Sequence, residues 1–358
     1  MVSVHIRAMT ILDRLGLAMP VIQAPMAGTS TPQLAAAVSE AGGLGSVAVG
    51  AVDASGARAM IAAVRAATDR AFNVNLFAHQ PAQADAARQT AWLAALAPLF
   101  RQYGAEPPAV LREIYTSILA DPTMQALLVE AAPPVVSFHF GLPGPDLVAA
   151  LKAGGSVLVS SATSLDEALA AARAGMDAVV AQGIEAGGHR GVFDPAAPDD
   201  GLGVLALTRL LVAQSGLPVI AAGAIMDGAG IAAVLKLGAV AAQLGTAFVA
   251  CPESNADAAY RAALFSPAAG HTVMTSAISG RPARCLANRF TAWGHAAQAP
   301  APAYPIAYDA GKALNAAAKA AGEGGFGAQW AGQGAPLARA LPAMELMRVL
   351  TQELAAAR

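Results

Sequence analysis

Short apolar runs recur along the chain, and a segment with helical periodicity follows most of them. Residues 20–24 (PVIQA) form the first such run. In the segment after it, Thr31 is an N-cap, Pro32 is the first helical residue, and Gly42 lies just past the helix end. The other predicted strands span residues 43–47, 72–77, 134–140, 156–160, 177–182, 217–223 and 239–245.

Eight strands that alternate with helices predict an α/β fold with a parallel sheet. The runs are almost continuously apolar, which is typical of strands buried on both faces. An open doubly wound sheet is the structural alternative. Eight evenly spread units favour a closed (β/α)8 TIM barrel. In the fifth unit, Ser164 and Glu167 have the spacing of a capping box.

Two regions fall outside the repeat. Residues 78–130 and 276–358 are largely helical in pattern, and we expect them to pack together as a smaller, mostly helical cap on the substrate side. The barrel then comprises residues 1–77 and 131–275. Peripheral helical decoration is the alternative interpretation, because insertions in loops are well tolerated.

Composition excludes several function classes. The chain has 358 residues, of which 56% are hydrophobic and 13% charged, with a net charge of −2, so no nucleic-acid partner is expected. No apolar stretch reaches the ~18 residues of a membrane span, and the N-terminus is too mixed for a secretory signal. We therefore expect a cytoplasmic protein, with a homodimer possible. Cys251 and Cys285 fit no metal-ligand spacing, and no other metal motif occurs.

Polar residues cluster where the predicted strands end, which is the active-site face of such a barrel. The sequence AQGIEAGGHRG (181–191) follows the sixth strand and contains His189 among glycines. Glu185 in this loop is expected to orient it or to pair with Arg190. His139 ends the fourth strand, where it either lines the pocket or bonds to backbone.

The loops after the last two strands predict a phosphate site. Gly223 permits close backbone approach, and Gly245 with Thr246 offers amide N–H groups and a hydroxyl. A cofactor with a monophosphate group is therefore expected. Gln182 and Gln243 each end a buried strand, where an unpartnered amide costs ~1–3 kcal/mol, so the cofactor is expected to supply their partners.

Six motifs together resemble the FMN-dependent nitronate monooxygenases, formerly called 2-nitropropane dioxygenases. They are PVIQAPMAGTSTPQLAAAVSEAGGLGSVA, NVNLF, VVSFHFG, DAVVAQGIEAGGHRG, PVIAAGAI and QLGTAF, extended by GRPARCLANRF and AYPIAYDAGKAL. The resemblance implies an FMN-bound barrel that oxidises small anionic alkyl nitronates, and possibly nitroalkanes, with O2 to carbonyl compounds and nitrite. It implies FMN contacts from Ala24, Pro25, Met26, Asn75, Gln182, Gly187, Gly188, Gly223, Gln243, Leu244, Gly245 and Thr246. It also implies a catalytic His189 and a C-terminal set, Tyr304, Tyr308 and Lys312, that closes over the substrate side. From its position, His139 is a further candidate for the substrate side.

The role of His189 has two interpretations. It removes a proton from a neutral nitroalkane, or it holds a nitronate that arrives as an anion. Tyr304, Tyr308 and Lys312 have the spacing of one helix face, so packing alone also explains them.

Three other functions fit the same loops. Two are an FMN-dependent enoyl-acyl-carrier-protein reductase and an NAD(P)H:quinone reductase, both of which consume a reduced nicotinamide. The third is a non-catalytic flavin-binding or quinone-sensing protein, which requires the phosphate loops but not His189.

Overall fold

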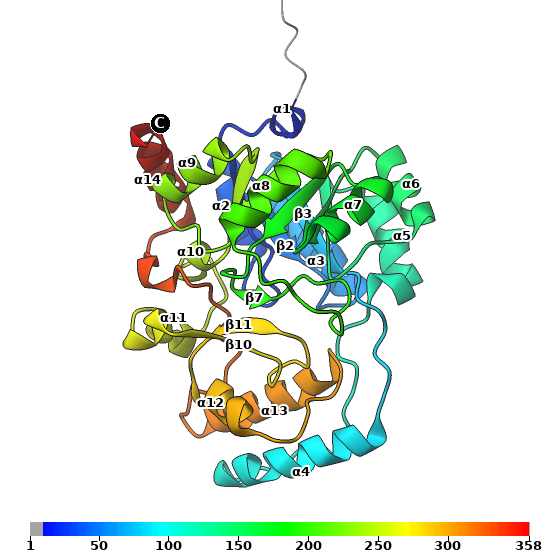
Figure 1. The fold of residues 1–358 in the computed structure, drawn as a ribbon, viewed down its shortest axis with the longest axis vertical. Coiled ribbons are helices and arrows are strands. Elements are labelled where there is room, and N and C mark those ends of the chain that lie inside the picture. The colour runs from blue at the N-terminus through cyan, green and yellow to red at the C-terminus, as the bar shows by residue number, and fades with distance from the viewer. Residues whose placement is uncertain (1–9, 358) are drawn as a thin grey trace, which may run out of the picture.

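The computed structural model describes residues 10–357, which form a parallel barrel with a cap at one end (Figure 1). The barrel strands are β1 (Val21–Gln23), β2 (Gly45–Ala48), β3 (Phe72–Phe77), β4 (Val135–His139), β5 (Val157–Ala162), β6 (Ala178–Gln182), β8 (Val219–Ala222) and β9 (Ala241–Leu244). Each lies within or overlaps a predicted run. Their order in the sheet is β1-β9-β8-β6-β5-β4-β3-β2, so sequential strands are neighbours.

Contacts between the first and second strands close the barrel. The amide of Gln23 donates to the Leu44 carbonyl, and the amide of Leu44 donates to the Val21 carbonyl, both at 2.9 Å. A parallel bridge joins Ile22 to Leu44. The predicted TIM barrel is therefore confirmed, and the open-sheet alternative is wrong.

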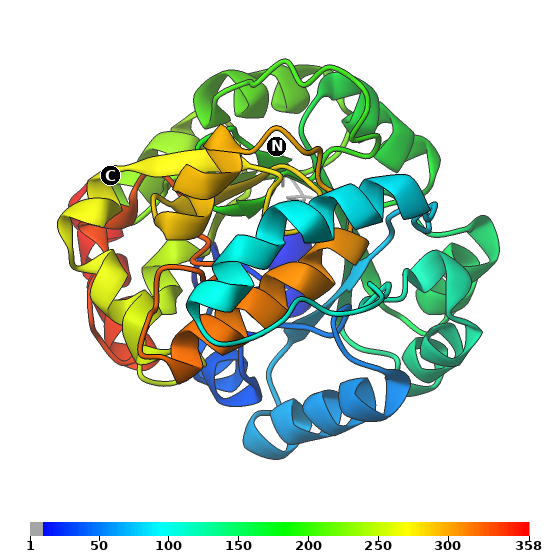
Figure 2. The same cartoon turned by 90° about the horizontal axis from the view of Figure 1, so that it is seen from below.

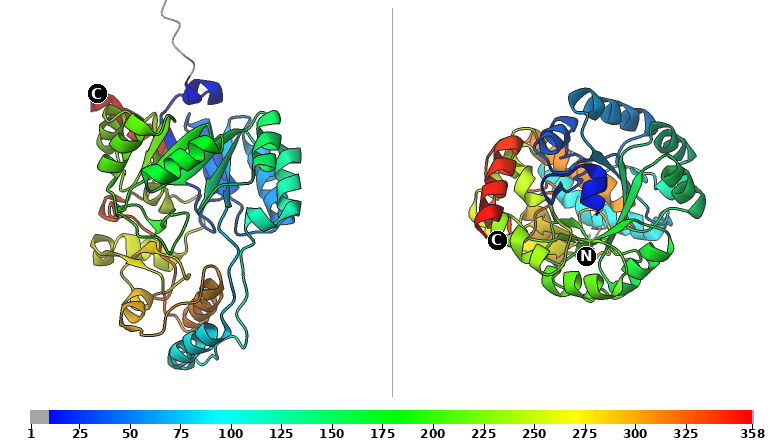
Figure 3. Two further views of the ribbon diagram at one scale, coloured as in Figure 1. Left: turned by 45° about the vertical axis from the view of Figure 1, so that its right-hand side comes forward. Right: turned by 90° about the horizontal axis from the view of Figure 1, so that it is seen from above.

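Helices surround the barrel, and one of them comes from the far end of the chain. The ring consists of α2 (Pro32–Glu40), α3 (Ala54–Ala67), α5 (Pro122–Ala131), α6 (Pro145–Ala153), α7 (Leu165–Arg173), α8 (Val204–Gln214), α9 (Gly228–Lys236) and α14 (Ala343–Ala356). After β9 the chain makes only the short α10 (Thr246–Val249), and α14 packs against α9 and α2 in the eighth position (Figure 3).

The sequence-based division of the chain differs from this packing in three segments. It assigns α14 and α5 to the cap, and it assigns residues 258–275, which belong to the cap, to the barrel. The apolar side of α14, including Leu346 and Leu350, is buried with residues of α2 and α9. Likewise, Leu127 and Leu128 of α5 are buried in a cluster with barrel residues. Both helices have strongly apolar faces, and the outer surface of the barrel buries them.

The cap contains helices and a small sheet. Its helices are α4 (Ala86–Gln102), α11 (Ala258–Leu264), α12 (Arg289–Ala296) and α13 (Ile306–Ala320), with 3-10 turns η1 (Ile118–Ala120), η2 (Pro267–Gly270) and η3 (Ala335–Leu337) along the connecting segments. Figure 2 shows α4 and α13 side by side across the mouth of the barrel. Trp92, Leu96 and Leu314 lie in their shared apolar cluster. The predicted packing of 78–130 on the C-terminal region is thus present through α4.

A three-stranded sheet joins the cap to the barrel, and the sequence did not predict it. It comprises β7 (Gly188–His189), β10 (Thr272–Thr275) and β11 (Ala283–Leu286), in the order β10-β11-β7. The antiparallel pairing places His189 opposite Ala283. The glycine-rich loop after β6 is therefore fixed by the cap rather than free.

Local signals explain the helix ends that frame the barrel. The Thr31 hydroxyl accepts a hydrogen bond from the Leu34 amide, as an N-cap does. Ser164 also caps its helix, but Glu167 accepts from the Thr163 amide instead of the Ser164 amide. The predicted capping box is therefore only half formed.

The opposite end of the barrel is covered by α1 (Ile11–Leu15). Figure 3 shows this helix over the N-terminal ends of the strands. Ile11 is buried in one cluster with Ile22, Leu44 and other residues that point into the barrel. This helix therefore covers the end of the barrel that lies opposite the cap (Figure 3). No helix within residues 10–357 is both long and apolar enough to cross a membrane.

Candidate active site

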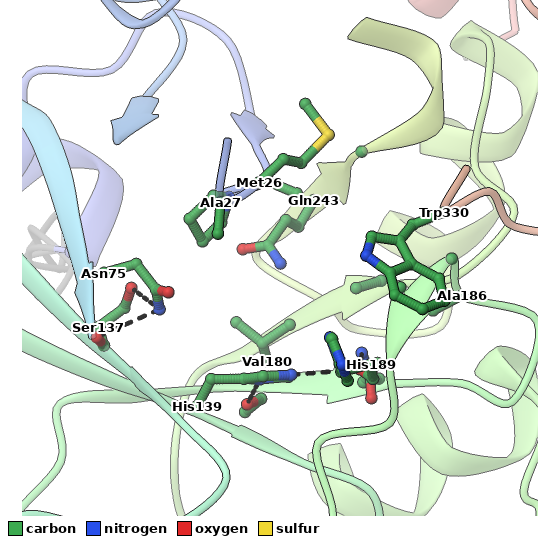
Figure 4. A pocket seen from close by; sticks show the side chains of 18 of the residues that line it. Met26, Ala27, Asn75, Ser137, His139, Val180, Ala186, His189, Gln243 and Trp330 are labelled. Carbon is green, nitrogen blue, oxygen red and sulfur yellow. Dashed lines mark hydrogen bonds between the residues drawn. The ribbon is translucent and has the colours of Figure 1, made fainter. Parts of the chain in front are cut away.

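A cavity that is partly open to solvent lies between the carboxyl ends of the strands and the cap (Figure 4). Fifteen of the predicted site residues line it: Ala24, Pro25, Met26, Asn75, His139, Gln182, Gly187, Gly188, His189, Gly223, Gln243, Gly245, Thr246, Tyr304 and Tyr308. The structure thus brings together residues that are up to 284 positions apart (24 to 308). Figure 4 shows Met26 and Gln243 across the cavity from His139 and His189.

Two predicted residues do not line this cavity. Leu244 is 1% exposed, and its side chain packs in the core between the barrel and its helices. Only its backbone serves the site, because its carbonyl accepts a hydrogen bond from the Ala24 amide at 2.8 Å. Lys312 lies behind the cavity wall, with Nζ 4.8 Å from the Tyr115 ring centroid and 5.4 Å from that of Tyr308.

Backbone groups form one side of the cavity, which we call the glycine side (Ala24–Met26, Gly187, Gly223–Ala224 and Gly245–Thr246). Gly223 and Ala224 line the cavity with consecutive positive φ angles of +145° and +52°. The N–H groups of Ala224 and Thr246 make no hydrogen bond to any residue in the described part of the chain. They are free to bind an anion.

Gly187 is required by a close approach of two backbones. A Cβ atom at this position would lie 2.4 Å from the Gly332 nitrogen and 2.5 Å from the Ala331 carbonyl carbon. The neighbouring Gly332 amide donates to the Thr246 hydroxyl at 3.0 Å. The segment before α14 is therefore packed against the glycine side and positions it.

Gln182 serves the protein itself. Its Oε1 accepts from the Gly191 amide at 2.7 Å, and its Nε2 donates to the His189 carbonyl at 3.0 Å. The expectation that a cofactor supplies its hydrogen-bond partner is therefore wrong for Gln182. The side chain instead folds the 181–191 loop back onto the end of β6.

Two charged residues of this loop are also structural. Both carboxylate oxygens of Glu185 accept from the Val204 amide, at 3.0 and 2.9 Å, and so cap α8, which has no cap of its own at Gly203. Glu185 does not pair with Arg190. The partner of Arg190 is Asp199, with Nε 2.7 Å from Oδ2, and this bond holds the pKa of Asp199 below its usual range.

His189 faces the cavity from β7. Its Nε2 is 2.8 Å from the Ser279 hydroxyl, and its ring centroid lies 5.0 Å from that of Trp330 and 5.3 Å from that of Tyr304. Burial, together with the nearby His139 and Arg281, lowers the pKa of His189 to about 3. The imidazole is therefore neutral at neutral pH and attracts an anion by hydrogen bonding rather than by charge.

His139 lies beside it. Its Nδ1 is hydrogen-bonded to the Ser161 hydroxyl, and its Nε2 is 3.2 Å from the His189 carbonyl. Burial lowers the pKa of His139 to about 4, so this ring is also neutral. Both interpretations of His139 from the sequence hold, because it lines the cavity and bonds to backbone. It supports the strand that carries His189.

Aromatic rings complete this second side, which we call the histidine side (Tyr115, His139, Phe140, His189, Tyr304, Tyr308 and Trp330). Tyr308 lies on α13, whereas Tyr304 precedes this helix, so the predicted helix face begins only at Tyr308. Sequence reasoning missed Tyr115, Phe140 and Trp330. Phe140 was within reach, because it belongs to the motif VVSFHFG.

Several polar groups in the cavity have no partner within the described residues. The Ser160 and Tyr304 hydroxyls are buried and unpaired, and both residues line the cavity. Gln243 also lines the cavity, and its side-chain amide has no hydrogen-bond partner among the described residues. Unpaired buried polar groups are costly. The cavity is therefore suited to a large ligand that has both polar and apolar surfaces.

Comparison with known proteins identifies the family. The nitronate monooxygenase family model matches residues 9–353. The chain belongs to the nitronate monooxygenase family. A protein named nitronate monooxygenase from Paraburkholderia phytofirmans is 64% identical over 345 residues, covering 96% of this chain and 94% of that protein. One of the same name from Pseudomonas aeruginosa is 58% identical over 341 residues, covering 95% and 97%.

Solved structures agree with this assignment. The nitroalkane oxidase of Streptomyces ansochromogenes superposes with a TM-score of 0.88 at 42% identity, covering 96% of this chain and 97% of that one. FabK from Thermotoga maritima is more distant, with a TM-score of 0.74 and 29% identity over 97% of this chain and 96% of that one. The nitronate monooxygenase family is thus favoured over the reductase alternative.

Proposed function

We propose that this protein is an FMN-dependent nitronate monooxygenase that converts alkyl nitronates and O2 into carbonyl compounds and nitrite. The observation that carries the proposal is the two-sided cavity. Free backbone amides lie on its glycine side, and a neutral His189 lies on the opposite histidine side. Family membership supports the reaction class.

The glycine side fits a flavin mononucleotide. The amides of Ala224 and Thr246 would hold its phosphate, because free N–H groups at these turns are suited to an anion. The segment Ala24–Met26 would border the ring, and Asn75 and Gln243 would face its polar edge. When bound, the flavin accepts electrons from the substrate and passes them to O2.

His189 would act on the substrate from the histidine side. As a neutral imidazole it can accept the acidic C–H proton of a nitroalkane, a contribution of typically ~10²–10⁴-fold. For a substrate that is already a nitronate, the same ring can only donate or accept a hydrogen bond. The surrounding rings of Phe140, Tyr304 and Trp330 exclude water and strengthen these interactions.

Anaerobic mixing tests the proposal. The purified, flavin-loaded protein is mixed without O2 with ethyl nitronate in one sample and with NADPH in another, and the flavin absorbance is followed. We expect rapid bleaching by ethyl nitronate and none by NADPH. Rapid bleaching by NADPH with no response to the nitronate would instead establish a reductase.

A further inference from the structure

Arg281 places an unpaired cation in the wall behind the cavity. Its side chain is 3% exposed, and one guanidinium nitrogen donates to the Val192 carbonyl. Its Nε has no hydrogen-bond partner within the described residues, and no carboxylate among them lies within 4.0 Å of the guanidinium. Proteins rarely bury a charge without a counter-charge, because desolvation is costly.

One aromatic ring separates this cation from the cavity. The guanidinium carbon lies 4.3 Å from the centroid of the Phe140 ring, in a cation–π contact. On the cavity side, the same ring lies 5.7 Å from the His189 ring and 5.3 Å from the Tyr304 ring. Phe140 has φ +75°, which is unusual for a bulky residue. The backbone is thus held in an unfavourable conformation that places the ring between Arg281 and the cavity.

The charge of Arg281 is not neutralised locally. Glu167 and Asp194 attract it from a distance. The two carboxylate oxygens of Glu167 are already occupied by the amides of Thr163 and Phe193, at 2.6 and 2.7 Å. Burial lowers the pKa of Arg281 only to about 10, so it stays charged at neutral pH.

Among the described residues, Arg281 is the only buried cation that lies over a ring of the histidine side. His139 and His189 are neutral, and the positive charge of Arg281 contributes to lowering the pKa of each. Lys312 also lies over two of these rings, Tyr115 and Tyr308, but it is exposed, so water screens its charge. Arg190 is paired with Asp199. The field of Arg281 therefore reaches the place where the substrate would lie.

We propose that Arg281 is a specificity-determining residue, whose charge acts across the Phe140 ring to make the histidine side prefer an anionic nitronate over the neutral nitroalkane. The proposal rests on the proposed function. Arg281 would not touch the substrate. It would act on the substrate only through its charge, across the Phe140 ring, and is therefore not a catalytic residue. In this account the bound nitronate is the counter-ion that the guanidinium lacks.

The test is to remove the charge and compare two ligands of one size. Arg281→Met keeps an unbranched side chain without the charge, and Arg281→Lys keeps the charge. For Arg281→Met we expect the KM for ethyl nitronate to rise roughly tenfold or more, the size expected for a charge ~8 Å away at an effective dielectric of ~20. The inhibition constant of nitroethane, competing with ethyl nitronate, should stay within about twofold. Arg281→Lys should recover most of the loss.

Arg261 provides a matched control. It is held by the carbonyls of Ala250, Ser254 and Ala256, has no carboxylate within 4.0 Å among the described residues, and does not line the cavity. Arg261→Met should lower thermal stability and leave the ratio of the two constants unchanged. A second readout is the calorimetric affinity for nitrate, a small planar anion, which should fall roughly tenfold in Arg281→Met only.

Three outcomes would overturn the proposal. If ethyl nitronate and nitroethane both bind more weakly by the same factor, Arg281 has only a structural role through its hydrogen bond to the Val192 carbonyl. Unchanged constants for both would show that its field does not reach the substrate. A lowered flavin midpoint potential with an unchanged KM would place its effect on the cofactor.

Failure of the proposed function is recognisable separately. In that case the wild-type protein does not oxidise ethyl nitronate at all. The role of Arg281 would then still be decided by nitrate affinity in the wild-type, Arg281→Met and Arg281→Lys proteins.

Discussion

The two sides of the cavity are built from different parts of the chain and in different ways. The glycine side consists mainly of backbone groups at the ends of β1, β8 and β9, which are adjacent strands of one barrel. The histidine side consists of side chains from β4, β7, α13 and the segments that contain Tyr115, Phe140, Tyr304 and Trp330. Backbone amides are suited to a constant anionic group, whereas buried rings and imidazoles control the charge and water around a reacting group.

Because the two sides differ in this way, replacing one histidine should impair the reaction without weakening cofactor binding. His189→Asn should lower kcat/KM for neutral nitroethane by ~10²–10⁴-fold, because the base is lost. Flavin affinity should be unchanged, since the phosphate contacts lie on the other side. Steady-state oxygen consumption and fluorescence titration measure the two quantities.

His271→Asn is the matched control for this experiment, because His271 is exposed and outside the cavity. It should leave both quantities unaltered. If His189→Asn retains full turnover of nitroethane, the proposal that the histidine side acts on the substrate is wrong.

A substitution on the glycine side should instead weaken flavin binding. Gly187→Ala forces the loop away from Gly332 and Ala331. Strain of this kind costs typically ~1–3 kcal/mol, so we expect flavin to dissociate roughly 5- to 150-fold more readily. Equilibrium dialysis of FMN against the apoprotein measures the effect.

Gly144→Ala is the control for this second experiment. Gly144 has φ −65°, and no atom lies within 4 Å of the position that an added Cβ would take, so alanine fits there. Equal FMN affinity in the Gly187→Ala and wild-type proteins would show that this backbone approach does not shape the glycine side.

A buried histidine behind the histidine side should also make the protein sensitive to acid. His79 is 1% exposed behind Tyr304, with ring centroids 5.1 Å apart, and burial lowers its pKa to about 4. Below its unfolded pKa of ~6.5, the unfolded chain binds a proton that the folded protein does not. Stability is therefore lost as pH falls from 7 to 5, by about 2 kcal/mol for this residue.

Replacing that histidine removes its share of the pH dependence. In His79→Phe, the free energy of unfolding should fall about 2 kcal/mol less than in the wild type between pH 7 and pH 5. Urea titrations at the two pH values measure this difference. Parallel pH profiles for the two proteins would mean that His79 is already protonated when folded.

The two sides also differ in how far the sequence predicts them. The glycine side is predictable because Gly223, Gly245 and Thr246 directly follow apolar strands, and strand ends meet at one rim. Leu244 belongs to the same continuous motif, but alternation along β9 points its side chain into the core.

The histidine side depends on contacts between distant segments. Tyr115 and Trp330 lie in segments without periodicity, and β7 forms only because β11, about a hundred residues later, pairs with it. Local sequence therefore contains no signal for the small sheet. It also contains none for α14 as the eighth helix of the barrel, because an amphipathic helix does not specify which surface buries it.

A crystal structure of the protein with FMN bound would test the two-sided cavity most directly. We predict phosphate oxygens within hydrogen-bonding distance of the amides of Ala224 and Thr246, and the His189 ring facing the reactive part of the flavin across the substrate space. A phosphate bound instead on the histidine side, next to Phe140 and Arg281, would contradict the account.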